Sequence, residues 1–161
     1  MKQLSHLDTS HSVTELGGNP QFFPLTKEAL VMSWGQITLY LKGKKGSFLD
    51  QWEPNQLFDE LMASFDTYLW VAVDGGEIEG LMLVSFSKTP KEKLLWITGV
   101  FCDDVRKYLP LHKNLEQWAV MCEASAVLFE GAHAWRRLLR KLGYATPTAM
   151  VKKDLRMMWS N

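Results

Sequence analysis

"YLWVAVDGGEIEGLMLVSFSKTPKEKLLWITGVF", Tyr68 to Phe101, is the stretch of sequence that decides the fold. It contains three runs of apolar and β-branched residues, each long enough for a strand. Asp74-Gly75-Gly76 separates the first two runs and is a hairpin signal, because glycine adopts positive φ without a steric penalty. A Lys-Thr-Pro turn separates the second run from the third. The stretch therefore predicts an antiparallel meander of three strands.

Helical and strand patterns flank this meander on both sides. Before it, the sequence predicts a helix over "KEALVMSWGQITLYL" with Thr26 as N-cap, and a second helix that starts at Pro54. After it come a helix over Lys113 to Glu123, a short buried strand "AVLFEG", a helix with the stripe Trp135, Leu138, Leu139 and Leu142 that Gly143 ends, and a final strand "TAMVKKDL". This order predicts an α/β (α+β) fold, with a central mixed, mostly antiparallel sheet and helices on both faces.

The chain divides into an N-terminal segment and one domain. Residues 1–25 are polar and rich in Gly, Asn and Pro towards their end, so we expect an arm or an edge strand there. Residues 26–161 are enough for a single domain with one core. The sequence shows no internal repeat.

Composition excludes several classes of protein. Lys and Arg number 18, as do Asp and Glu, so no bulk charge indicates nucleic acid or a membrane as partner. The N-terminus has no apolar stretch typical of a signal peptide, and nowhere do about 18 apolar residues run together. We expect a protein that is neither exported by a signal peptide nor membrane-spanning. The 7 Trp and 8 Met favour core positions over an interface.

The cysteines and histidines do not indicate a metal site. Cys102 and Cys122 fall on segments expected to be a strand end and a buried helix face, which suits free thiols in a reducing compartment. His6 and His11 lack the i, i+4 spacing of a helical pair of metal ligands. A structural zinc needs about four ligands, and the sequence does not bring them together.

The most specific stretch is "EGAHAWRRLLRKLGYATPTAMVKKDL", Glu130 to Leu155. With the order of elements from Pro54 onwards, it resembles the GNAT superfamily of acyl-CoA N-acyltransferases, and most of all the short GNAT-like proteins of tailed bacteriophages. The resemblance implies a GNAT-like domain in which the fourth strand splays from the fifth. In active members, pantetheine lies in that gap, and a glycine-containing loop after the fourth strand binds the pyrophosphate.

The chain departs from this pattern in that loop. The equivalent segment is "CDDVRKYLPLHKN", and no glycine occurs between Gly99 and Gly131. Glycines matter at such a loop because a Cβ would block the close approach of the phosphates. Asp103 and Asp104 also place two carboxylates where an anion should bind, which we expect to cap a helix or close a turn. The same segment contains three cations that could offset the repulsion: Arg106, Lys107 and Lys113.

The resemblance also implies catalytic positions that this chain fills differently. Aligned on Leu138, Gly143 and Tyr144, the chain has Ala132, Trp135 and Leu139 where active members carry Asn, Ala and the Tyr that acts as general acid. Tyr144 occupies an aromatic position that is ordinarily core. General-base candidates are Asp103, Asp104, Glu130, His112 and His133, although for each of them the sequence favours a solvated or capping residue.

The sequence leaves two main functions open. The first is a virion component or binding module with a degenerate acyl-CoA site and no cofactor. Its partners would be other virion proteins (portal, tail or internal core) in a multi-copy assembly, with the host cytoplasm as its location before assembly. The basic face formed by Arg136, Arg137, Arg140 and Lys141 would then be an interaction surface, with DNA contact as one option.

The alternative is an active N-acetyltransferase that moves the acetyl group of acetyl-CoA to an amine of a protein or small molecule. Asp103 and Glu130 would then be catalytic. The residues binding the cofactor would be Val100, Phe101, Arg106, Lys107 and Lys113. A third option, a protein that inhibits a bacterial host factor, differs from the virion component only in its partner.

Overall fold

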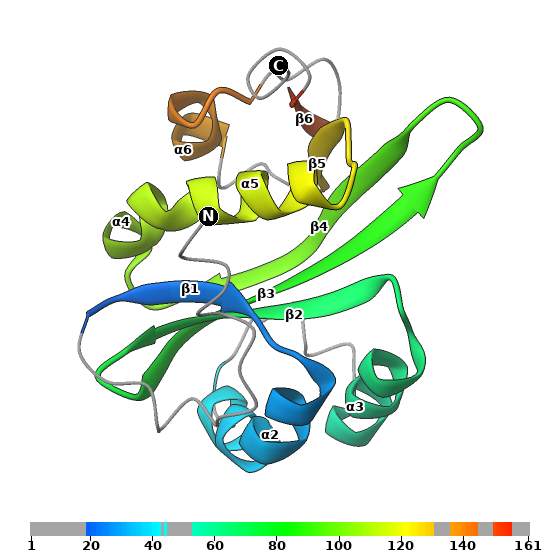
Figure 1. The fold of residues 1–161 in the computed structure, drawn as a ribbon. Helices are drawn as coiled ribbons and strands as arrows, with labels where there is room; N and C mark the ends of the chain where they lie inside the picture. Colours follow the sequence, from blue (N-terminus) through cyan, green and yellow to red (C-terminus); the bar gives the residue numbers. More distant parts are fainter. Residues whose placement is uncertain (1–18, 43, 45–52, 131–135, 145–149, 156–161) are drawn as a thin grey trace.

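The computed structural model describes residues 19–42, 44, 53–130, 136–144 and 150–155. Within this part of the chain, one six-stranded sheet has the order β1-β2-β3-β4-β5-β6 (Figure 1). The strands are β1 (Gln21–Pro24), β2 (Thr67–Asp74), β3 (Glu77–Lys88), β4 (Lys93–Cys102), β5 (Ala126–Glu130) and β6 (Met150–Asp154). Neighbours pair antiparallel except β4 and β5, which run parallel. The predicted mixed, mostly antiparallel sheet is confirmed.

Helices cover both faces of this sheet, as predicted. They are α2 (Lys27–Leu41), α3 (Pro54–Ala63), α4 (Val105–Tyr108), the 3₁₀ turn η3 (Leu109–Leu111), α5 (His112–Met121) and α6 (Arg136–Lys141). Figure 1 shows α2 and α3 on one face and α4, α5 and α6 on the other. The side chain of Thr26 accepts a hydrogen bond from the amide of Ala29, which confirms it as the N-cap of α2.

Glycine conformations end elements where the sequence predicted. Gly75 and Gly76 have φ of 60° and 80°, and Asp74 pairs with Glu77, so β2 and β3 are joined by a two-residue hairpin turn. Gly143 has φ of 90° after α6, where the amide of Tyr144 bonds to the carbonyl of Leu139. Both turns fix the direction in which the chain re-enters the domain.

The segment after β4 differs from the prediction of a loop running to a helix at Lys113. The helical backbone begins at Val105 and continues through η3 into α5. Asp104 is the N-cap of α4, and its side chain accepts from the amide of Lys107. Pro110 does not interrupt the chain, because it lies in the first turn of η3, where its missing amide hydrogen is not needed. The loop between β4 and its helix is therefore only Asp103 and Asp104.

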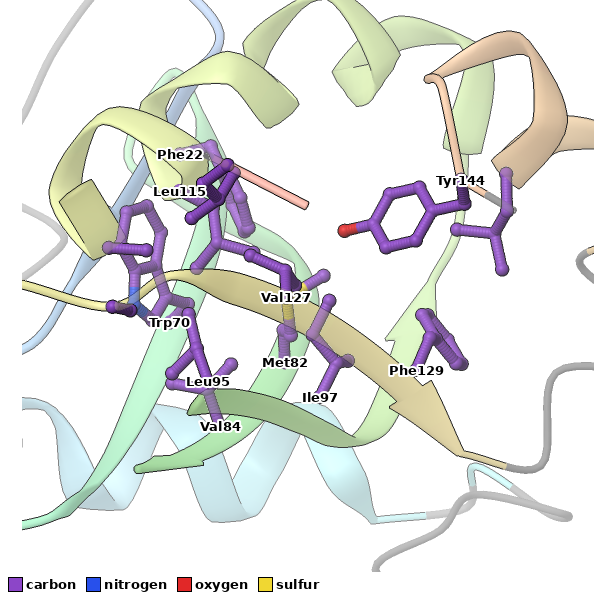
Figure 2. Close-up of a cluster of buried hydrophobic side chains, with 14 of the residues drawn as sticks. Phe22, Trp70, Met82, Val84, Leu95, Ile97, Leu115, Val127, Phe129 and Tyr144 are labelled. Carbon is purple, nitrogen blue, oxygen red and sulfur yellow. The ribbon is translucent and has the colours of Figure 1, made fainter. Parts of the chain in front are cut away.

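Each sheet face carries its own cluster of buried side chains. The cluster under α5 and α6 includes Trp70, Ile97, Leu115 and Val127, all less than 1% exposed (Figure 2). The cluster under α2 and α3 includes Ile37, Leu57, Leu61 and Val71. Alternation along β2 explains the division, because neighbouring residues of a strand face opposite sides of the sheet. No helix of the described residues is long and apolar enough to cross a membrane.

Candidate active-site cleft

Strands β4 and β5 part midway along β4. Their pairing runs from Leu94 with Ala126 to Ile97 with Phe129, whereas β4 continues to Cys102. Among the described strands, the edge of β4 from Thr98 onwards that faces β5 therefore has no partner. Backbone amides and carbonyls along such an edge are available to another molecule.

A pocket opens at this parting, between the sheet and the helices of one face. It encloses about 620 Å³ outside the protein atoms, part of which is open to solvent. Its lining includes Val100, Phe101 and Cys102 from β4, Phe129 from β5, and Leu139 and Leu142 of the α6 segment. Val100 and Phe101, which the sequence analysis assigned to a cofactor, lie in this cleft. Leu139, at the position of the expected acid, is a buried apolar wall of the same pocket.

A bulge lies in β4 just before the cleft. Leu83 pairs with Gly99 and Val84 with Ile97, so Thr98 is an extra residue in β4. The Thr98 hydroxyl donates to the carbonyl of Leu83 at 3.2 Å. Thr98 was not among the predicted site residues, although the glycine that follows it within a strand is a signal for a bulge.

The two carboxylates at the end of β4 have separate roles. The carboxylate of Asp104 caps α4, with 3.4 Å between Oδ1 and the amide of Lys107. The carboxylate of Asp103 accepts from the Tyr40 hydroxyl at 3.1 Å and from Lys44 Nζ at 3.4 Å, which links β4 to the α2 segment. Burial, and then the charge of Asp103, raise the pKa of Tyr40, so this phenol stays a neutral donor. The Asp103 side chain therefore points towards the α2 segment, on the face of the sheet opposite α5 and α6, and it does not line the pocket.

Lys107 is held by two other carboxylates. Its Nζ lies 2.5 Å from Asp74 Oδ2 and 2.8 Å from Glu79 Oε1, and Tyr108 Oη donates to the same Glu79 oxygen at 2.6 Å. The hydrogen bond from Lys107, followed by that from Tyr108, lowers the pKa of Glu79. Glu79 can reach both partners because it is an extra residue in β3, where Ala72 pairs with Gly80 and Val73 with Ile78. The charge of Lys107 is thus already neutralised.

The other predicted cations are on the surface. Arg106 and Lys113 are exposed on the helical segment after β4. Arg137, Arg140 and Lys141 are exposed on α6, which agrees with a basic outer face, while the side chain of Arg136 is outside the described residues. Some of these exposed cations are neighbours in sequence of residues that line the pocket. Lys113 follows His112, and Arg140 and Lys141 lie between Leu139 and Leu142.

His112, a general-base candidate, is buried at the start of α5 and lines the pocket. Its Nε2 lies 2.8 Å from Tyr144 Oη and 3.9 Å from Glu116 Oε2. Burial, and then the charge of Glu116, raise the pKa of Tyr144, so the phenol keeps its proton, and the tautomer of His112 decides which of the two groups donates. Figure 2 shows the Tyr144 ring pointing from the α6 side into the buried cluster. Tyr144 is in the core, as expected, but it also supports a polar group of the pocket.

Other candidates lie partly or wholly outside the described residues. Glu130 ends β5 opposite Met150, and its side chain is not described. His133, Ala132 and Trp135 fall outside the description. Cys102 and Cys122 are free thiols, as predicted, and burial raises the pKa of both, that of Cys102 to about 11. Among the described residues, no group of three or more His, Cys, Asp or Glu side chains could hold a metal ion.

Solved structures similar to this one include acetyltransferases. A protein of Desulfovibrio desulfuricans assigned to the GNAT family of acetyltransferases matches with a TM-score of 0.64 and 9% identity, covering 84% of this chain and 99% of the other. An acetyltransferase of Clostridium acetobutylicum with acetyl-CoA matches with a TM-score of 0.55 and 12% identity, over 78% and 90% of the two chains. An aminoglycoside acetyltransferase from an uncultured soil sample, in complex with sisomicin, matches with a TM-score of 0.56 and 16% identity, over 77% and 85%.

These similarities establish the fold. No protein-family model and no curated protein matches the sequence. The neighbours share the arrangement of strands and helices at an identity too low to carry over any activity. The chain has the fold of the GNAT acetyltransferases, as the resemblance implied.

Proposed function

We propose that the protein binds an acyl-CoA in the cleft between β4 and β5 and transfers the acyl group to an amine. The observation that carries this proposal is the parting of the two strands after Ile97 and Phe129, with an open pocket at that place. Unpaired backbone groups at a strand edge inside a domain cost free energy. A bound ligand that pairs with these groups would offset that cost.

The residues of the cleft fit one part of an acyl-CoA better than the other. The unpaired edge of β4 from Thr98 to Phe101 offers amides and carbonyls for the two amide groups of pantetheine, and the side chains around it are apolar. The start of α4 fits the diphosphate less well, because the carboxylate of Asp104 already accepts from that turn. A bound diphosphate would have to displace this cap, which costs about 1 kcal/mol.

The bound cofactor would supply an activated acyl thioester, and the chain would supply the groups that move protons. Of the two carboxylates that follow β4, Asp103 is the one that does not cap α4, and it would accept the proton that the attacking amine loses. Tyr40 and Lys44 fix its orientation by two hydrogen bonds. A general base must be held within reach of the substrate in this way.

Calorimetry with acetyl-CoA and the full chain tests the binding step, and release of free thiol in the presence of primary amines tests the transfer. We expect a dissociation constant in the micromolar range, and transfer that Asp103→Asn reduces at least a hundredfold. Asp59→Asn, on the exposed side of α3, is the matched control and should have no effect. Absence of binding at millimolar acetyl-CoA would rule out the transferase.

A first prediction concerns the charge at the start of α4. Asp104→Asn keeps a side-chain oxygen for the cap but removes a negative charge near the expected diphosphate. At an effective dielectric near 20 and about 8 Å, each pair of like charges costs roughly 2 kcal/mol before salt screening. We therefore expect Asp104→Asn to tighten acetyl-CoA binding about tenfold at low salt, as measured by calorimetry. An unchanged affinity would place the phosphates elsewhere.

A second candidate function is the binding module without acyl transfer, such as a phage virion component with portal, tail or core proteins as partners. Three observations favour it: Asp104 occupies the helix start, Asp74 and Glu79 neutralise Lys107, and Leu139 replaces an acid. Mass spectrometry of purified particles tests the virion role. Many copies of the chain per particle, together with no acetyl-CoA binding, would favour this function over the transferase.

A further inference from the structure

The pocket extends from the cleft across the sheet, along a row of small residues. Ala72, Gly80 and Cys102 are register partners on β2, β3 and β4, and Phe22 of β1 continues the row. All four residues line the pocket. Neighbouring strands lie about 4.8 Å apart, so the small residues from β4 to β2 span about 10 Å, and the larger Phe22 follows on β1. The next row on the same face holds Trp70, Met82 and Val100, which are larger.

Gly80 sets the depth of the floor of this row. A Cβ at Gly80 would lie 3.2 Å from Ala72 Cβ and from Cys102 Sγ, so a larger residue does not fit between them. Helix α4 and η3 form the opposite wall through Val105, Tyr108 and Leu109. The hollow therefore lies between a floor of small side chains and one helical segment.

The few polar side chains along the pocket are already engaged. The Tyr108 hydroxyl donates to Glu79, and His112 Nε2 lies at hydrogen-bond distance from Tyr144 Oη. The thiol of Cys102 is hydrogen-bonded to the backbone of Asp104. A polar ligand would lose its hydrogen bonds to water here without replacement, whereas a hydrocarbon chain gains by leaving water.

Exposed cations lie next in sequence to residues of the pocket. Arg106 follows Val105, Lys113 follows His112, and Arg140 and Lys141 lie between Leu139 and Leu142. The two carboxylates that precede Arg106 in sequence are engaged, Asp103 by Lys44 and Asp104 by the amide of Lys107. An apolar chain inside the pocket can thus carry an anionic group at its rim.

We propose that this pocket binds an unbranched, medium-length alkyl chain with an anionic head group. The chain lies along the Ala72–Gly80–Cys102 row, and the head group meets the exposed cations. Such a chain occurs in a free fatty acid and in the acyl tail of a fatty acyl-CoA. Binding of the free acid requires no acyl transfer, so this inference goes beyond the proposed function.

Calorimetry on the full chain with decanoate, decanoyl-CoA and acetyl-CoA tests it and distinguishes the sources. Binding of decanoate supports the alkyl-chain site on its own. Binding of decanoyl-CoA at least tenfold tighter than acetyl-CoA, without binding of decanoate, also supports it and assigns the chain to an acyl donor. If decanoate does not bind and decanoyl-CoA binds no tighter than acetyl-CoA, the proposal is overturned, whether or not the protein is a transferase.

Two variants localise the site. Ala72→Leu fills the row and should weaken binding of the decyl ligand at least tenfold. Leu109→Glu places a carboxylate at a half-exposed position of the pocket wall and should also weaken binding of the decyl ligand at least tenfold. This variant tests the site even if Ala72→Leu does not fold. Ala63→Leu adds the same side chain at an exposed position of α3 and is the control. Unchanged decyl binding in the folded variants would overturn the proposal.

Discussion

Gly80 is a residue of β3 at which the sheet leaves no room for a side chain. Its missing Cβ would lie 3.0 Å from the carbonyl oxygen of Phe101, which belongs to the backbone of β4 and cannot turn aside. We expect Gly80→Ala to lower the free energy of unfolding by about 1–3 kcal/mol, because the strands must shift to admit the methyl group. Urea unfolding followed by tryptophan fluorescence measures the change.

Gly35 is the natural comparison for this substitution. It lies inside α2 and has nothing within 4 Å of a built Cβ. Gly35→Ala should raise the free energy of unfolding by about 0.5–1 kcal/mol, since alanine favours the helix. If both variants changed the free energy of unfolding in the same direction, the prediction that Gly80 is too closely packed for a methyl group would be wrong.

Cys102 gives a prediction about reactivity. Burial raises the pKa of its thiol to about 11, although the backbone of Asp104 partly counteracts burial. The thiolate is the reactive form, so at neutral pH only a minute fraction of Cys102 can react. We expect slow modification by an aromatic disulfide reagent at pH 7.5, with a rate that climbs until about pH 11.

Cys122 and the unfolded chain provide the controls for this measurement. Cys102→Ser leaves only the thiol of Cys122, and urea should expose both thiols to rapid reaction. Rapid modification of Cys102 in the folded protein at neutral pH would mean that the wall of the pocket at β4 is open to solvent.

At the scale of elements, Glu79 holds α4 against the β2–β3 hairpin. Hydrogen bonds from Lys107 and Tyr108 lower its pKa below the usual 4.5. The folded state therefore favours the charged carboxylate, and this contribution to stability is complete above pH 4.5. It is lost as the pH falls through the lower pKa of the folded protein. We expect Glu79→Gln to show a smaller drop in Tm between pH 6 and pH 3 than the unchanged protein.

Glu77→Gln is the matched control, because Glu77 is exposed at the start of the same strand. Its Tm should follow that of the unchanged protein across this range. An equal acid-induced drop in the Glu79 and Glu77 variants would show that the bonds to α4 do not contribute to folding stability.

The elements themselves were largely predictable from periodicity, whereas their irregularities were not. Apolar spacing identified β2, β3, β4 and α5, since it depends only on residues close in sequence. The helical start at Val105, ahead of the helix predicted from Lys113, was missed, and Pro110 is compatible with it because proline is tolerated in a first helical turn. The bulges at Glu79 and Thr98 depend on which residues pair across strands, and a single strand pattern does not contain that information.

For the whole molecule, the two clusters of buried side chains lie on opposite faces of the same sheet and both include residues of β2 and β3. Leu115 is fully buried in the cluster under α5, and Leu61 is 3% exposed in the cluster under α3. Leu115→Ala and Leu61→Ala should each lower the free energy of unfolding by about 2–5 kcal/mol. Because the clusters do not touch the same residues, the double variant should lose the sum to within about 0.5 kcal/mol.

Urea unfolding of the two single variants and the double variant measures these values. Val31→Ala, on the exposed side of α2, is the control for the loss of a surface side chain and should change little. A double variant that lost clearly less than the sum would show that the two clusters unfold as separate units.

The candidate site was predictable in its position and not in its detail. The resemblance to the GNAT superfamily implied a gap between the fourth and fifth strands, and Val100 and Phe101 line the pocket at that place. The partners of Lys107 are about 30 residues away in sequence, at Asp74 and Glu79, so the sequence could not show that this cation is neutralised. The row of Ala72, Gly80 and Cys102 likewise exists only through strand register.

The short pairing between β4 and β5 makes the sheet a structure with a seam. Beyond Leu94–Ile97, the β5, α6 and β6 end of the domain is joined to the rest by side-chain packing instead of a continuous ladder of hydrogen bonds. A ligand bound in the cleft would contact both β4 and β5 and stabilise their arrangement, the more so the tighter it binds. Occupancy and mechanical strength are therefore coupled: the domain is most easily pried apart along this line when it is empty.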